Sequence, residues 1–159
     1  MLGEQADQAP LHIIAAPPVL YLGAFFLGVA IHAVFPLWGF PLPNLARIPG
    51  GLLLLLSAAF ARWAFWTMRQ VGTTANPKQE SQVLVTGGPF RFSRNPIYVA
   101  MTGLYLGLAL LVNAFWPLML LGPLLALMEW GVIRREEHYL AAKFGEPYTS
   151  YQSKVRRWV

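Results

Sequence analysis

The 159-residue chain is 56% hydrophobic and 12% charged, with a mean hydropathy of +0.47. This is far more apolar than a soluble domain of that length, so the composition excludes an ordinary soluble protein and predicts a membrane protein. The absence of cysteine excludes disulfides, thiolate metal sites and cysteine redox chemistry. The net charge of +5 accompanies no nucleic-acid-binding motif, so we expect no nucleic-acid partner.

The N-terminal segment carries Glu4 and Asp7 but no Lys or Arg before the first apolar block. A secretory signal normally begins with positive charge, so we expect no cleavage here. Residues 9–18 are predicted to lie along the membrane interface before the first span.

Four apolar blocks follow, each about as long as the roughly 17–25 residues that a spanning helix needs. They cover residues 19–38, 49–65, 97–112 and 115–132. The fold is therefore predicted to be all-α, with about four transmembrane helices. Only Asn113 and Ala114 separate the last two blocks, which predicts a tight helical hairpin.

The polar region 67–95 is too long for a plain turn, which is typical of a functional loop. Within it, residues 82–86 alternate like a short extended segment, and 87–89 are predicted to turn the chain back to the membrane. Residues 134–144 are expected to continue the fourth helix beyond the bilayer and to stop at Gly145.

Eleven of the twelve basic residues fall on one side of a four-helix topology, and only Arg47 falls on the other. The first side holds both termini and the 66–96 loop. The positive-inside bias makes this side cytoplasmic.

Arg91 and Arg94 precede the third apolar helix and offer planar cations suited to a carboxylate or phosphate. Asn95 can cap that helix, and Pro96 fits its first turn. A structural alternative remains, in which the segment only caps the helix while the arginines reach for the interface.

Glu129 lies within the fourth apolar block, where an ionisable group is a functional candidate by default. It could equally form a structural ion pair with Arg62 or Arg134. Glu136 and Glu137 lie seven and eight residues further on, so at least one shares a helix face with Glu129. Alternatively, this pair is solvated and balanced by neighbouring arginines.

Four tyrosines accompany these charges, and they could form an interfacial belt or a cage for a cationic ligand. They are Tyr98, Tyr139, Tyr148 and Tyr151. No histidine pair has metal-ligand spacing, so no metal site is expected. Nucleophile-elbow, Walker-type and dinucleotide-binding motifs are also absent from the sequence.

The motif G-P-F-R-F-S-R-N-P-I-Y (88–98), followed by E-E-H-Y-L-A-A-K-F-G-E-P-Y-T-S-Y (136–151), resembles the isoprenylcysteine carboxyl methyltransferase family and its bacterial relatives. The related phospholipid methyltransferases share this pattern. Residues 73–74, 76–77 and 83–86 also resemble the family. On this resemblance, residues 1–159 form one methyltransferase-like domain, in which 1–70 supply the first spans and 72–157 the cofactor-binding hairpin and tail.

The resemblance implies a methyl transferase that uses S-adenosylmethionine, bound in a cytoplasmic pocket, and a lipophilic or small acceptor such as a carboxylate, thiol or lipid amine. The implied cofactor-binding candidates are Arg94, Asn95, Pro96, Tyr98, Glu136, Glu137, Leu140, Tyr148, Tyr151 and, more weakly, Arg156. Glu129 and Arg91 are candidates near the acceptor. Many family members have His where this chain has Asn95, so no base at that position is expected.

Two alternatives remain open: an NADPH-dependent enzyme resembling membrane sterol reductases, and a non-catalytic membrane subunit of the same fold. The expected location is a bacterial inner membrane, with both termini cytoplasmic. Gly103 and Gly107 permit close helix packing, either within one chain or between chains.

Overall fold

The computed structural model describes residues 14–36, 43–72 and 83–159, and within these residues every regular element is helical. The elements are α1 (Pro17–Val34), α2 (Pro43–Gln70), the 3₁₀ turn η1 (Gly88–Arg91), α3 (Pro96–Val112), α4 (Phe115–Met128), the π-turn η2 (Glu129–Ile133), α5 (Arg134–Phe144) and α6 (Glu146–Lys154). The all-α prediction is therefore confirmed.

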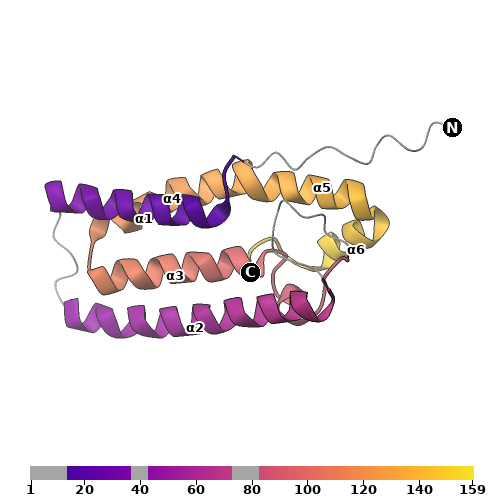
Figure 1. Ribbon diagram of the computed structural model, residues 1–159, viewed down its shortest axis with the longest axis horizontal. Helices are drawn as coiled ribbons and strands as arrows, with labels where there is room; N and C mark the ends of the chain where they lie inside the picture. The colour runs from indigo at the N-terminus through magenta and orange to yellow at the C-terminus, as the bar shows by residue number, and fades with distance from the viewer. Residues whose placement is uncertain (1–13, 37–42, 73–82) are drawn as a thin grey trace.

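Three helical stretches are long and apolar enough to cross a membrane: Pro17–Val34, Arg47–Gln70 and Phe115–Phe144. The shorter apolar helix α3 has 17 residues, and its length of about 26 Å is close to the thickness of a bilayer core. Figure 1 shows α1 to α4 running alongside one another as an elongated bundle, with α5 and α6 beyond one end. The architecture is that of a membrane protein.

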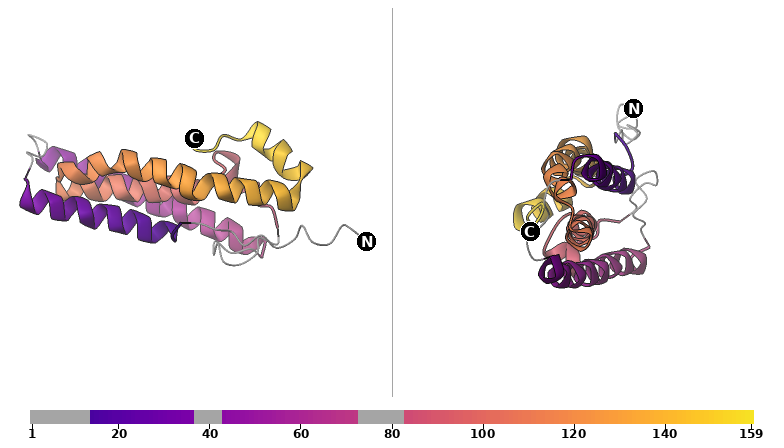
Figure 2. Two further views of the ribbon diagram at one scale, coloured as in Figure 1. Left: turned by 90° about the horizontal axis from the view of Figure 1, so that it is seen from above. Right: turned by 90° about the vertical axis from the view of Figure 1, so that its left-hand side faces the viewer.

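The bundle is built from two closely packed pairs, because α2 packs along α3 and α1 packs along α4. The end-on view of Figure 2 shows α3 between α2 and the other pair. Glycines allow the α2–α3 approach. A Cβ on Gly50 would lie 3.0 Å from the Gly107 carbonyl oxygen, and one on Gly103 would clash with the Ser57 hydroxyl. The small-residue face of α3 therefore packs within the chain.

In the second pair, α1 and α4 come into contact at Gly28 and Pro117. A Cβ added to Gly28 would lie 2.8 Å from backbone atoms of Pro117. Buried side chains between α1, α3 and α4 form the core: Tyr21, Tyr105, Leu124, Met128, Val132 and Ile133. The Tyr105 hydroxyl donates to the Pro117 carbonyl at 2.8 Å. This bond satisfies a polar atom that would otherwise be costly in an apolar interior.

The helix bounds correct several expectations. Helix α1 begins at Pro17, so the end of the segment predicted to lie along the interface belongs to the first spanning helix. Residues 9–13 of that segment and Trp38 lie outside the described residues. Helix α2 extends well beyond the predicted 49–65 at both ends, and Pro49 lies inside it.

The turns follow their local sequence. Asn113 adopts a left-handed conformation with φ of 54° and ends α3, as the hairpin requires. Gly145 has φ of 58° and ends α5. The chain then begins a further helix, α6, that was not expected. Of the predicted extended segment 82–86, residues 83–86 form no strand, and residue 82 lies outside the described part.

Candidate functional site

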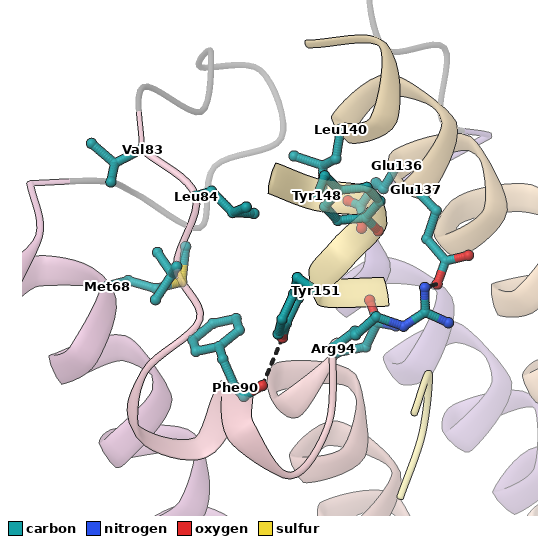
Figure 3. Close-up of a pocket in the computed structure, with 12 residues that line it drawn as sticks. Met68, Val83, Leu84, Phe90, Arg94, Glu136, Glu137, Leu140, Tyr148 and Tyr151 are labelled. Atoms are coloured by element: carbon teal, nitrogen blue, oxygen red, sulfur yellow. Dashed lines mark hydrogen bonds and ion pairs between the residues drawn. The ribbon is translucent and has the colours of Figure 1, made fainter. Parts of the chain in front are cut away.

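A cavity of about 100 Å³ lies at the end of the bundle where α5 and α6 leave the membrane-spanning helices. Its walls come from α2, the segment before η1, the segment before α3, and helices α5 and α6 (Figure 3). The lining residues are Met68, Val83, Leu84, Val85, Phe90, Arg94, Asn95, Glu136, Glu137, Leu140, Tyr148 and Tyr151.

Seven of the ten residues predicted to bind a cofactor therefore line one cavity. Of the other three, Pro96 is buried at the start of α3 and Tyr98 contacts the cavity residue Glu136. Arg156 is exposed and outside the lining. The two acceptor candidates, Arg91 and Glu129, are also outside it.

The apolar side of the cavity comes from Met68, Phe90 and residues 83–85, which lie in the region 67–95 predicted to be functional but were not among the predicted site residues. Met68 belongs to the last turn of α2 rather than to a loop. A methionine at the end of an apolar helix carries no signal of a site. Its role depends on the packing of α2 along α3.

Arg94 is the most unusual residue of the cavity. Its side chain is only 9% exposed, and Nη1 lies 3.2 Å from Glu137 Oε1. Nevertheless, Nε and Nη1 are buried without a hydrogen-bond partner among the described residues. A buried polar donor without a partner is costly, so this cation is suited to receive an anionic group from a ligand.

Glu136 is held by Tyr98, whose hydroxyl lies 2.8 and 2.9 Å from its two carboxylate oxygens. Tyr98 also accepts, at its carbonyl, a 2.8 Å bond from the Thr102 hydroxyl. Tyr21 reaches the same hydroxyl at 2.8 Å. These contacts link α5, α3 and α1, and they fix the carboxylate on the side of the cavity nearest the bundle.

The Glu137 carboxylate is shared between two arginines. Arg157 donates from Nε to Oε1 at 3.0 Å and from Nη2 to Oε2 at 2.7 Å, which is a two-point ion pair. Arg157 also contacts Glu129 through Nη1. These contacts raise the pKa of Arg157, so it stays charged. Arg157 was not among the predicted site residues.

Both carboxylate oxygens of Glu129 have partners, which favours the alternative that this residue forms a structural ion pair. Besides Arg157, it accepts from Arg134 Nε at 3.2 Å and from Trp158 Nε1 at 3.2 Å. Of its two expected partners, Arg134 is therefore found, whereas no ion pair with Arg62 is seen in the described part of the chain.

The π-turn η2 explains why Glu129 and Glu137 meet the same arginine. Eight residues of ideal α-helix would rotate Glu137 about 80° away from Glu129. A π-turn accommodates one extra residue and takes up about 100° of rotation, so the two carboxylates come within roughly 20° of one face. Such turns occur frequently at functional sites.

Asn95 does not cap α3, which corrects the expectation from sequence, since its side chain makes no capping bond. Its amide nitrogen instead donates to the Arg157 carbonyl at 3.0 Å, as does the buried Ser93 hydroxyl at 3.1 Å. The backbone N–H of Arg94 donates to the Arg156 carbonyl at 2.9 Å. The Asn95 side chain is thus held by its nitrogen to the C-terminal tail, in an orientation in which its oxygen makes no capping bond.

Tyr148 and Tyr151 form the aromatic wall contributed by α6, with ring centroids 6.2 Å apart. Burial raises the pKa of Tyr148 to about 12, so its hydroxyl stays neutral at physiological pH. The Tyr151 hydroxyl donates to the Phe90 carbonyl at 2.7 Å and so ties α6 to η1. Figure 3 shows both rings facing the cavity.

The cavity therefore combines a buried cation with free donors, two carboxylates held by partners, and aromatic rings beside apolar side chains. This combination suits a zwitterionic ligand with an apolar or aromatic part. Its volume is below the roughly 300–1,000 Å³ of a typical ligand pocket, so a ligand of that size would extend beyond the space that the described residues enclose.

Comparison with known proteins gives one family-level match: the phospholipid methyltransferase model matches residues 45–147. An uncharacterized protein of Haemophilus influenzae is 59% identical over 27 residues, which are 17% of this chain and 43% of that protein. The chain thus matches less than half the length of this relative. No solved structure matches the chain. The family match includes the cavity residues from Met68 to Leu140.

Proposed function

The chain belongs to the phospholipid methyltransferase family, and on this premise we propose that it binds S-adenosylmethionine in the cavity and methylates a lipophilic or small acceptor at the cytoplasmic membrane face. The family match supports the reaction class, methyl transfer by a membrane protein. The choice of methyl donor, the residues that hold it and the membrane face are our proposal. The crowding of basic residues on the side of the cavity supports the cytoplasmic assignment.

The observation that carries the proposal is the buried Arg94 guanidinium with donors left free. The methionyl part of S-adenosylmethionine ends in a carboxylate, which is the natural acceptor for such a group. Binding would supply the hydrogen bonds that Arg94 lacks, so the cost of burying this cation would be recovered in the complex.

The other walls suit the remaining parts of the same ligand. The ring faces of Tyr148 and Tyr151 can stabilise a sulfonium cation. Glu136 and Glu137 can accept from ribose hydroxyls, because their carboxyl oxygens have lone pairs that their present partners do not all use. The apolar residues around Phe90 and Met68 provide contact area for the adenine.

When bound, S-adenosylmethionine supplies a methyl group that an acceptor's lone pair takes as the carbon–sulfur bond breaks. The described residues of the cavity offer Asn95 rather than an imidazole beside Arg94, and an amide cannot take up a proton. Asn95 therefore supplies no base, and alignment of the reactants and exclusion of water suit an acceptor that is already anionic or a free amine. Arg91 and Glu129 remain proposals for the acceptor side.

The proposal is tested by the thermal shift of the detergent-purified protein with S-adenosylhomocysteine and, in parallel, NADPH. A ligand that binds only the folded state raises its melting temperature. We expect a shift from the adenosyl ligand, loss of that shift in Arg94→Ala, and an unchanged shift in Arg62→Ala, which removes an exposed arginine of α2. A shift from NADPH alone would instead favour the reductase alternative, and a folded protein with no shift would favour a non-catalytic subunit.

A further inference from the structure

The C-terminal tail, residues 155–159, makes contacts that the proposed function does not use. Its backbone receives three hydrogen bonds from the segment that carries Arg94: one from each of Ser93, Arg94 and Asn95. Its Arg157 side chain reaches the opposite wall and pairs with Glu137 on α5. The tail therefore connects the two walls of the cavity that carry opposite charges.

Arg157 also determines how Arg94 and Glu137 interact. Both arginines approach Glu137 Oε1, but only Arg157 has hydrogen-bond geometry toward the carboxylate. Arg94 is thus stabilised by the nearby negative charge, while its Nε and Nη1 make no hydrogen bond. Without Arg157, Glu137 could turn toward Arg94 and occupy those donors.

Besides Glu137, a second carboxylate binds the Arg157 side chain. Glu129 contacts its Nη1, and Glu129 is itself bound by Trp158 and Arg134. The Arg157 side chain is 29% exposed, whereas the Glu137 side chain is 8% exposed. The pair is therefore partly desolvated, and its fork-to-carboxylate geometry specifies orientation as well as charge.

We infer that Arg157 is a positioning residue of the cavity: by engaging both oxygens of Glu137, it keeps the Arg94 donors available for the carboxylate of the ligand. This inference rests on the proposed function, because it assumes that Arg94 receives that carboxylate. Arg157 itself need not touch the ligand. Its effect should depend on whether the ligand carries the carboxylate, which a general loss of stability would not produce.

The test is calorimetric binding of two ligands to the full chain in detergent: S-adenosylhomocysteine and its decarboxylated analogue. For Arg157→Ala we expect about tenfold weaker binding of S-adenosylhomocysteine, corresponding to one compromised charge-assisted hydrogen bond, and little change for the analogue. Arg157→Lys should recover only part of the affinity, because an ammonium cannot bridge two carboxylate oxygens. Lys154→Ala, which removes an exposed charge from the end of α6, is the matched control.

If Arg157→Ala does not fold, Arg157→Lys and Glu129→Gln provide the same comparison, since both should selectively weaken S-adenosylhomocysteine. Equal losses for the two ligands, or no loss for either, would overturn the inference while leaving the proposed function intact. If the folded wild-type protein binds neither ligand, the proposed function fails and the inference fails with it.

Discussion

Individual side chains of the cavity are held by partners that lie far away in sequence. Glu136 accepts a hydrogen bond from Tyr98, which is 38 residues away in sequence, and Glu137 accepts one from Arg157, which is 20 residues away. Each carboxylate thus has a defined orientation before any ligand is present. Preorganised groups of this kind lower the ordering cost of binding.

Replacing Tyr98 with Phe tests the first of these contacts. The substitution removes the hydroxyl that lies within 2.9 Å of both oxygens of Glu136. Because a largely buried acceptor left without its partner costs about 1–3 kcal/mol, we expect the free energy of unfolding to fall by roughly that amount. Chemical denaturation in detergent measures the loss.

Tyr139→Phe is the matched control, because its hydroxyl contacts only Lys143, at 3.3 Å, among the hydrogen bonds described. We expect a change below about 1 kcal/mol for this partly solvated contact. Equal losses in the two variants would show that the bond to Glu136 contributes no more to the free energy of unfolding than the contact of Tyr139 with Lys143.

Close backbone contacts arrange the helices within each of the two packed pairs. Within a bilayer, lipid tails are as apolar as leucine, so small residues that let helices approach closely determine the packing. Gly50 and Gly107 provide that approach between α2 and α3, and Gly28 provides it between α1 and α4. The α2–α3 contact matters for the site because it brings Met68 to the cavity.

The stabilities of Gly50→Ala and Gly51→Ala test this packing of α2 against α3. A Cβ at Gly50 would meet Leu110 Cβ at 2.9 Å, whereas a Cβ at Gly51 meets nothing within 4 Å. Both variants gain about 1 kcal/mol of helix propensity, but only Gly50→Ala overpacks, at a cost of about 1–3 kcal/mol.

We therefore expect Gly51→Ala to be as stable as the parent or more stable, and Gly50→Ala to be less stable than Gly51→Ala. Thermal unfolding of both proteins in the same detergent measures the difference. If Gly50→Ala were the more stable variant, α2 and α3 would not pack as described.

At the scale of the whole molecule, the sequence predicted features that local chemistry determines. The apolar blocks, the tight turn at Asn113 and Ala114 and the stop at Gly145 all follow from the residues at those positions. The π-turn η2 did not, because a one-residue change of helical register leaves no mark in an apolar sequence. Its consequence, that Glu137 rather than Glu136 shares Arg157 with Glu129, was therefore also missed.

The site was only partly predictable for the same reason. The motif around Arg94 and the glutamates of α5 indicated two walls of a cavity. Asn95, however, was expected to cap α3 and instead binds the tail, because the Arg157 carbonyl lies within reach of its amide. Which of several partners a polar side chain chooses depends on tertiary packing.

The proposed methyl donor would bind between Arg94 and the aromatic wall formed by Tyr148 and Tyr151. The most direct measurement is ultraviolet cross-linking of methyl-labelled S-adenosylmethionine to the purified full chain, followed by mapping of the labelled peptides. We expect label in peptides containing Phe90, Tyr148 or Tyr151, and we expect excess S-adenosylhomocysteine to reduce it. Competable label confined to peptides of α1 would contradict it, as would a folded protein that takes up no competable label.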